Sequence, residues 1–209
     1  MLKVGITGGI GSGKSAVCKI IEKFGNPILY ADDIAKELLF TNDAVKKRIR
    51  YEFDEDIYDE KGSIDKKKLA KLIFFDSKLK TKLENIVHPF VIDYVKKQFK
   101  KFESSNEYKI IFLEAALIYE SGVDELLDYV VVVNADQERC INRVIERDKT
   151  SRDDVLGRIN AQMDPKQKVE MADFVIHNNG DINSLNTNVE FIYKLLLKIS
   201  ETQNGLKST

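Results

Sequence analysis

A glycine-rich segment near the N-terminus constrains the fold of this chain more than any other feature. Residues 8–15 read GGIGSGKS, which fits the phosphate-binding pattern G-x-x-x-x-G-K-[ST], and they follow the short apolar run at residues 2–7. Apolar residues then recur at helical spacing from Val17 to Phe24. Strand, glycine loop and helix are the context that the motif requires, and this context disfavours the alternative of a glycine-rich turn without a ligand.

The residue types of this loop are suited to hold the phosphates of ATP. Glycines let successive backbone N–H groups point into one concavity, and the following helix adds the positive end of its dipole. Lys14 can bridge the β- and γ-phosphates, and the Ser15 hydroxyl can ligate Mg²⁺. We therefore expect ATP and Mg²⁺ as cofactors, with ATP bound along the loop by Gly9, Ile10, Gly11, Ser12, Gly13, Lys14, Ser15 and Ala16.

Apolar segments separated by helical patterns predict the rest of the fold. Helices are expected at residues 137–147, 151–163 and 185–197. Strands that alternate with helices indicate an α/β fold, in which helices flank a five-stranded parallel sheet. The five expected strands lie at residues 2–7, 27–30, 109–113, 129–133 and 174–176.

The segment between the second and third strands shows helical patterns and no strand signal. We expect helices at residues 42–53, 63–75 and 77–87, with Asn42 as the first cap and an acidic loop at residues 54–62. The pair His88-Pro89 is expected to break the chain before a helical stripe resumes at residues 90–102. This segment therefore looks like a helical insertion into the core.

Length and charge limit the classes of function. The chain has 209 residues, enough for one such core with an insertion, and its formal net charge is −1. This balance does not suggest a nucleic-acid partner, and no apolar run is long enough to span a membrane. Cys18 and Cys140 lack metal-binding spacing, so reduced, buried thiols are expected. We expect a soluble, cytoplasmic protein.

Carboxylates follow two of the expected strands, where α/β sheets place ligands. Asp32 and Asp33 come after the second strand, and one of them could hold an acceptor hydroxyl or a Mg²⁺-bound water. A helix N-cap is the alternative, and one of the two is expected to cap. Glu114 ends the third strand and could support Mg²⁺, with a capping or solvated carboxylate as the alternative.

Five arginines lie within residues 139–158 of a chain that mostly uses lysine. Arginine presents a fixed planar fork to phosphate, so we expect Arg143 and Arg147 to be functional and Arg139 to be solvated. The alternative is a solvated face paired with nearby acidic residues. His88 is more often a structural residue in such a setting, and Asn178 lies in a turn that could also contact an adenine edge.

Over nearly its whole length the sequence resembles the bacterial dephospho-CoA kinases. Residues 5–15 are similar to the particular phosphate-binding loop of that family, and Ala31-Asp32-Asp33-Ile34-Ala35-Lys36 looks like its A-D-x-x-A-R segment. The other similar pieces follow in the order that the family has. They are the His-Pro turn at residues 86–89, the segment 116–120, the lid at residues 143–148 and 158–162, and the last strand with its adenine loop at residues 172–180.

The resemblance implies a P-loop kinase fold of three parts. These are a nucleotide-binding core at residues 1–30, 106–142 and 165–209, a helical substrate domain at residues 31–105, and a short helical lid at residues 143–164. It also implies transfer of the ATP γ-phosphate to the ribose 3′-hydroxyl of dephospho-CoA, the last step of coenzyme A synthesis. We expect a monomer or weak homo-oligomer without nucleic-acid or membrane partners.

The resemblance further implies catalytic roles. Asp32 takes the position of the acceptor-activating aspartate, and Asp33 becomes an extra carboxylate that caps the helix. Lys14 and Arg143 join Asp32 as catalytic groups, and Arg147 becomes a lid group on the phosphates. Asn178 is then an adenine contact, and the metal is held by Ser15 and Glu114. The acceptor is bound by Asp32, Lys36, His88, Glu114 and Leu117.

A few positions depart from the family pattern, and other functions remain as alternatives. Tyr30 replaces an aspartate, Lys36 an arginine, Ala116 a proline and Cys140 a glutamine. The nearest alternative is another small-molecule kinase of the same architecture, such as one for a nucleoside monophosphate. A more distant alternative is an ATP-driven switch or a nucleic-acid-associated ATPase, which the near-neutral charge disfavours.

Overall fold

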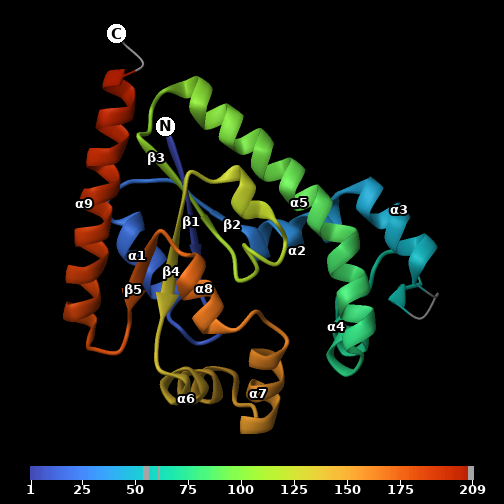
Figure 1. Cartoon of the computed structure of the whole chain (residues 1–209). Helices are drawn as coiled ribbons and strands as arrows, with labels where there is room; N and C mark the ends of the chain where they lie inside the picture. Colours follow the sequence, from blue (N-terminus) through green and yellow to red (C-terminus); the bar gives the residue numbers. More distant parts are fainter. Residues whose placement is uncertain (54–56, 61, 207–209) are drawn as a thin grey trace. The chain divides into compact units, whose positions relative to one another are not determined.

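The computed structural model describes residues 1–53, 57–60 and 62–206 (Figure 1). The chain folds into two compact units. Met1–Tyr30 and Gln98–Thr209 form the first, which we call the core unit, and Ala31–Lys97 form the second, the helical unit. Among the described residues, no helix combines the length and the apolar character needed to cross a membrane.

The core unit is built on a five-stranded sheet in the order β2-β3-β1-β4-β5, with every neighbouring pair parallel. Central strand β1 pairs with β3 on one side and with β4 on the other. This topology confirms the expected α/β fold, and each expected strand is present to within one residue at either end. The strands are β1 (Leu2–Thr7), β2 (Ile28–Tyr30), β3 (Ile110–Glu114), β4 (Tyr129–Asn134) and β5 (Phe174–His177).

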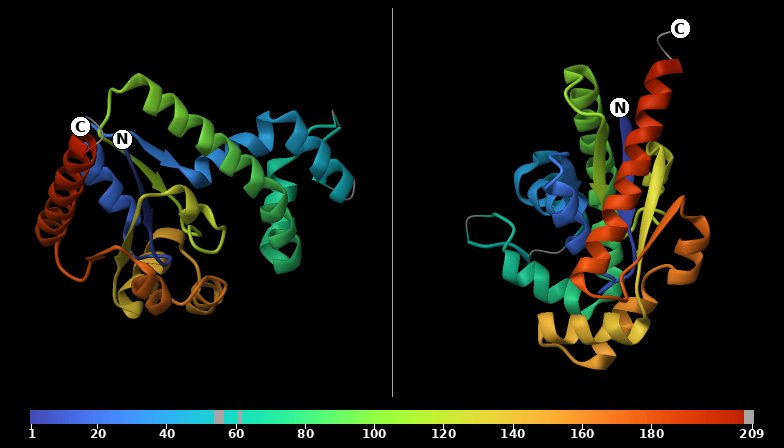
Figure 2. Two further views of the ribbon diagram at one scale, coloured as in Figure 1. Left: turned by 45° about the horizontal axis from the view of Figure 1, so that its top comes forward. Right: turned by 90° about the vertical axis from the view of Figure 1, so that its left-hand side faces the viewer.

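Helices flank this sheet. α1 (Lys14–Glu22) and α9 (Ile182–Leu206) pack against each other, and both views of Figure 2 show them side by side. α8 (Pro165–Met171) packs against β4, and α6 (Gln137–Asp148) packs against α7 (Arg152–Asn160). A short 3₁₀ helix, η2 (Val123–Leu126), precedes β4. The order of strands and helices places the ends of β1, β3 and β4 at one edge of the sheet.

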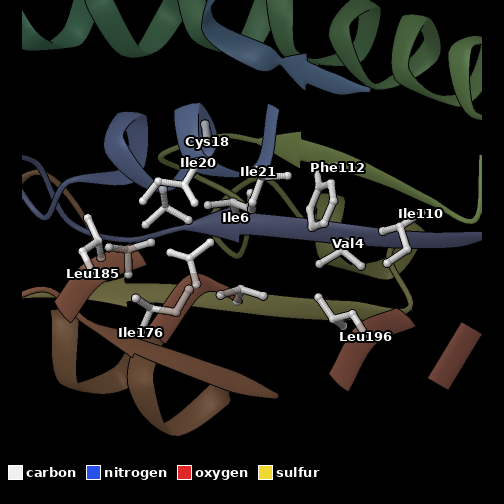
Figure 3. Close-up of a cluster of buried hydrophobic side chains, with 14 of the residues drawn as sticks. Val4, Ile6, Cys18, Ile20, Ile21, Ile110, Phe112, Ile176, Leu185 and Leu196 are labelled. Atoms are coloured by element: carbon white, nitrogen blue, oxygen red, sulfur yellow. The ribbon is translucent and has the colours of Figure 1, made fainter. Parts of the chain in front are cut away.

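Apolar side chains from the sheet, α1 and α9 form the main core (Figure 3). Parallel strands covered by helices are apolar along their length because both faces are buried, and Val4, Ile6 and Phe112 are fully buried here. Burying a side chain of this size stabilises the fold by about 1.5–3 kcal/mol. The core therefore fixes β1 and α1, the two elements that hold the glycine loop between them.

The helical unit contains α2 (Ala31–Thr41), α3 (Asp43–Glu52), α4 (Lys66–Phe75) and most of α5 (Ser77–Ser105). Asn42 caps α3 as expected, since its side chain accepts hydrogen bonds from the N–H groups of Ala44 and Val45. α4 begins later than expected because Asp65 caps it in the same way. Residues 54–56 and 61 of the expected acidic loop lie outside the described residues.

The expected break at His88-Pro89 is wrong, because α5 continues through Pro89. The proline removes the N–H that would bond the Asn85 carbonyl, at a cost of about 3 kcal/mol. The apolar face has the same phase on both sides of it, since Val87, Val91, Val95 and Phe99 recur every four residues and are all buried. Burial at about 1.5–3 kcal/mol for each of four side chains outweighs the penalty.

The expected helix at residues 151–163 is shorter in the structure and is followed by a helix that the sequence pattern did not reveal. α7 ends at Asn160. α8 begins at Pro165, where the missing N–H costs nothing, and the Asp164 side chain caps it by accepting from the Lys166 N–H at 2.7 Å. Polar residues on both sides of this short helix hide its period in the sequence.

Candidate functional site

The glycine loop connects β1 directly to α1, and its shape requires glycine at several positions. Gly8, Gly11 and Gly13 have φ angles of 151°, 76° and 100°, in the region that side chains disfavour. A methyl group at Gly8 would overlap the Val133 carbonyl, and one at Gly11 would overlap the Cys140 carbonyl. The loop is thus packed tightly against the end of β4 and against α6.

Two side chains from distant parts of the chain hold the loop's carbonyl groups. Asn178, which follows β5 and is only 6% exposed, donates from Nδ2 to the Ser12 carbonyl at 2.8 Å. Arg143 on α6 donates to the carbonyls of Gly11 at 3.3 Å and Ser12 at 3.4 Å, and to the Asn178 carbonyl at 3.0 Å. Because the N–H of a trans peptide points away from its carbonyl, these contacts direct the Gly13 N–H to the opposite side.

The lysine of the motif lies back over the start of the loop. Lys14 Nζ donates to the Gly8 carbonyl at 2.9 Å and to the Gly9 carbonyl at 3.3 Å. The Ser12 hydroxyl is buried and finds no hydrogen-bond partner in the part of the chain that the structure describes. An unpaired buried hydroxyl costs free energy, and it marks this loop as a place built for a further polar group.

Glu114 ends β3, next to the end of β1, and is 8% exposed. Burial raises the pKa of the Cys18 thiol to about 12, and the Glu114 carboxylate contributes to this rise. Burial also raises the pKa of Tyr30, whose hydroxyl donates to Glu22 at 2.7 Å. Glu114, Cys18 and Tyr30 are therefore neighbours at the ends of β2 and β3.

The oxygen donors near the glycine loop decide whether this site suits Mg²⁺. Over residues 1–53, 57–60 and 62–206, no three His, Cys, Asp or Glu side chains gather as a metal site. Mg²⁺ in nucleotide sites takes few protein ligands, because it keeps water and phosphate oxygens. The exposed Ser15 hydroxyl at the start of α1 and the carboxylate of Glu114 are hard oxygen donors of the required kind, so the residues present fit this ion.

The arginines of residues 139–158 divide into two groups. Arg143 contacts the loop, whereas the others form ion pairs at the surface. Arg147 binds Asp148 through two hydrogen bonds of 2.7 and 3.1 Å, and Arg158 reaches the same carboxylate at 2.9 Å. The Arg147 guanidinium, with help from Arg158, lowers the pKa of Asp148 to about 2. The remaining pairs are Arg139–Asp136 and Arg152–Glu138.

α6 and α7 also contact the tip of the glycine loop. Ile10 packs against a small apolar cluster of Ile141, Val144 and Val155, and its N–H donates to Gln162 Oε1 at 3.2 Å. Beside this contact lies a pocket of about 820 Å³, lined by the loop, the end of β4, α6, the end of α7 and α8. Gln162 ends the lid segment that the resemblance implies, but nothing in its local pattern distinguishes it from a solvated glutamine or predicts its contact with Ile10.

The expected residues of the helical unit have defined places within that unit. α2 begins at Ala31, so the expectation that Asp33 caps it is wrong, and both aspartates lie in its first turn. Asp33 instead accepts from Lys36 Nζ at 3.0 Å, while Asp32 is exposed. His88 lies inside α5 and is half-buried. Leu117, in the core unit, follows β3 and is half-buried as well.

Comparison with known proteins supports the resemblance seen in the sequence. A family model described as dephospho-CoA kinase matches residues 2–184. The dephospho-CoA kinase of Fusobacterium nucleatum is 36% identical over 187 residues, which cover 90% of this chain and 94% of the relative. That of Carboxydothermus hydrogenoformans is 37% identical over 181 residues, 87% of each.

A solved structure agrees with this match. The dephospho-CoA kinase from Campylobacter jejuni aligns with a TM-score of 0.68 at 27% identity, and the alignment covers 96% of this chain and 98% of that one. The family match extends from β1 into the start of α9, so it includes the glycine loop, Glu114, α6–α8 and Asn178. The chain therefore belongs to the dephospho-CoA kinase family.

Proposed function

We propose that this chain transfers the γ-phosphoryl group of ATP to the 3′-hydroxyl of dephospho-CoA, giving coenzyme A and ADP. The observation that supports the proposal most is the glycine loop, whose carbonyls are held by Asn178 and Arg143 in a chain that matches this family over residues 2–184. The reaction is the last step of coenzyme A biosynthesis. We place it in the cytoplasm, in a monomer or weak homo-oligomer.

ATP is bound in this proposal by the loop from Gly9 to Ala16. Lys14 now donates to two loop carbonyls, and phosphate oxygens can accept the same hydrogen bonds when ATP enters. Asn178 and Arg143 support nucleotide binding by holding the loop in place, and the positive charge of Arg143 lies next to the loop. A preorganised donor set of this kind stabilises the charge of the transferring phosphoryl group.

The proposed metal ligands are the Ser15 hydroxyl and the Glu114 carboxylate. Mg²⁺ bound there would neutralise developing charge on the phosphates. Ser15 is exposed at the first turn of α1, where phosphate oxygens would also gather, and Glu114 is held at the end of a buried strand. The protein's own contribution is to hold these oxygens at the same edge of the sheet as the loop.

Arg147 is the proposed lid group on the ATP phosphates. Its side chain is 62% exposed and pairs with Asp148. An exposed ion pair contributes about 0–1 kcal/mol, so phosphate can replace Asp148 at little cost. Arg158 shares Asp148 and can keep that carboxylate paired when Arg147 leaves.

Asp32 is the proposed base for the acceptor hydroxyl. It would orient the 3′-hydroxyl and take its proton, while Lys36, His88 and Leu117 would contact the acceptor. Asp33 is the poorer candidate because Lys36 already engages its carboxylate. Exclusion of water by the lid would keep water from competing as acceptor.

The test is ADP release from ATP and Mg²⁺ with one acceptor at a time: dephospho-CoA, AMP, CMP, UMP and pantetheine phosphate. Turnover with dephospho-CoA alone is the expected result. Turnover with a nucleoside monophosphate instead would keep the phosphate-loop assignment and reject the proposed acceptor. ADP release that needs no acceptor, or that depends on nucleic acid, would reject the kinase proposal.

A further inference from the structure

Lys168 on α8 is a lysine whose side chain is completely buried. Its exposure is 0%, and its ammonium donates to the Ala116 carbonyl at 2.8 Å and pairs with Glu120 Oε1 at 2.8 Å. An ammonium taken out of water is unfavourable unless it is paired and hydrogen-bonded. Its two partners lie in the same loop, and each of them makes a further contact.

The partners of Lys168 connect three segments of the core unit. The Ala116 carbonyl also accepts from the Thr7 hydroxyl at 3.3 Å, and Thr7 is the buried last residue of β1. Glu120 Oε1 also accepts from the Met163 N–H at 3.0 Å, between α7 and α8. Lys168 therefore joins the end of β1, the loop at residues 115–120 and the end of the segment 143–164.

Each of these segments continues directly into the nucleotide site. The loop at residues 115–120 follows Glu114 without a gap and contains Leu117. Met163 adjoins Gln162, whose side chain accepts from the Ile10 N–H of the glycine loop. The segment that follows α7 is therefore bonded to the loop after β3 through Met163 and to the glycine loop through Gln162.

We propose that Lys168 is a positioning residue for phosphoryl transfer, acting as one ion pair with Glu120. Lys168 does not contact a reacting group. It fixes the loop after β3, which continues from Glu114. Through Glu120 and Met163 it also holds the C-terminal end of the segment 143–164. The inference rests on the proposed function. ATP binding should depend on it little, because Asn178 and Arg143 bond the carbonyls of the glycine loop directly and Lys168 does not.

The experiment compares Lys168→Met with Gln167→Met, a control on the same helix whose side chain is exposed. We expect Lys168→Met to lower kcat at least tenfold and to change the KM for ATP less than twofold. Amide hydrogen exchange at Met163 should be at least tenfold faster. Gln167→Met should match the parent protein in all three measurements.

A second variant tests the same ion pair in case Lys168→Met does not fold. Glu120→Gln keeps the Lys168 hydrogen bond to Ala116 and removes the charge of the pair, and we expect at least a threefold loss of kcat. If the residues act as one pair, the double variant Lys168→Met/Glu120→Gln loses no more kcat than the worse single variant.

Several outcomes would overturn the inference. Folded Lys168→Met or Glu120→Gln protein with the parent kcat would do so, and so would losses that multiply in the double variant. If Lys168→Met raised the KM for ATP by the same factor by which it lowered kcat, the variant would have damaged the site generally and the positioning role would be rejected. Failure of the parent protein to phosphorylate dephospho-CoA would reject the proposed function, and exchange at Met163 would still report whether the ion pair holds that segment.

Discussion

The side-chain amide of Asn178 donates to the Ser12 carbonyl at 2.8 Å, across 166 residues of sequence. The same amide lies so close to Gly13 that a methyl group there would overlap it. Arg143 binds the Asn178 carbonyl and also the carbonyls of Gly11 and Ser12. The phosphate loop is therefore shaped by residues after β4 and β5 as much as by its own glycines.

Replacing Asn178 by alanine should weaken ATP binding. The Ser12 carbonyl would keep only the longer contact from Arg143, and the loss of a buried hydrogen bond lowers the free energy of unfolding by about 1–3 kcal/mol. We expect ATP affinity to fall roughly tenfold, since about 1.4 kcal/mol corresponds to a factor of ten. Titration calorimetry with ATP and urea unfolding measure the two effects. Asn179→Ala is the control, because Asn179 bonds Asp136 and not the loop.

Gly13→Ala should cost more than its backbone angle alone explains. Gly25 has a similar left-handed φ of 80°, but a methyl group added there would meet no atom within 4 Å, so Gly25→Ala measures the conformational cost, about 1–2 kcal/mol. At Gly13 the methyl group also meets Asn178. We expect Gly13→Ala to abolish measurable ATP binding and to be milder in an Asn178→Ala background. Equal free-energy changes of unfolding at the two glycines would contradict this.

Features that depend on local order could be read from the sequence. The strand, the glycine loop and Lys14-Ser15 are contiguous in the sequence. The motif therefore predicts a strand before it and a helix after it, and the apolar patterns on both sides support the motif. The Asn42 cap and the strands are equally local. Lys14 and Ser15 need no distant information because the loop itself places them at the start of α1.

Features that depend on contacts between residues far apart in the sequence could not be predicted from local patterns. The hydrogen bonds that Arg143 donates to the carbonyls of Gly11 and Ser12 join residues more than 130 positions apart, and the sequence did not predict them. The role of Arg143 on phosphate stays a prediction. Lys168 lies among polar residues and looks solvated, but its partners follow β3, and Ala116 is 52 residues away. Pro89 predicts a break by itself, and only the apolar face on both sides of it shows why α5 continues.

Asp32→Asn should slow catalysis strongly without weakening ATP binding. Loss of a general base typically lowers the rate about 10²–10⁴-fold. The glycine loop is unchanged, so ATP affinity should stay within twofold. Steady-state kinetics with dephospho-CoA and calorimetry with ATP separate the two. Asp33→Asn, which removes a carboxylate already paired with Lys36, should retain at least a third of the parent kcat. A reversed order of the two variants would assign the base to Asp33.

Arg147→Ala should lower activity with little change in stability. Its pair with Asp148 is exposed, so the free energy of unfolding should change by no more than about 1 kcal/mol. If Arg147 closes on phosphate, kcat should fall about ten- to a hundredfold, as for loss of a charge-assisted contact worth about 1.5–3 kcal/mol. Arg152→Ala, which removes a comparable exposed pair with Glu138, serves as the control. Equal kcat values for the two variants would remove Arg147 from the site.

The thiol of Cys18 should resist alkylation in the folded protein. Its pKa is raised from 9.0 to about 12, mainly by burial, and the thiolate is the reactive form. At pH 8 the raised pKa lowers the thiolate fraction about 10³-fold, because each pKa unit is a factor of ten. A Cys140→Ser variant leaves Cys18 as the one thiol of the chain. Iodoacetamide should label this thiol at least about 10³-fold more slowly in the folded protein than in the chain unfolded by urea. The same shift makes a pH prediction. The unfolded chain loses the proton first, so this contribution to stability is complete below pH 9 and declines as pH rises towards 12. Labelling of the folded variant at the rate of the unfolded chain would show that Cys18 is not held in the buried place beside Glu114.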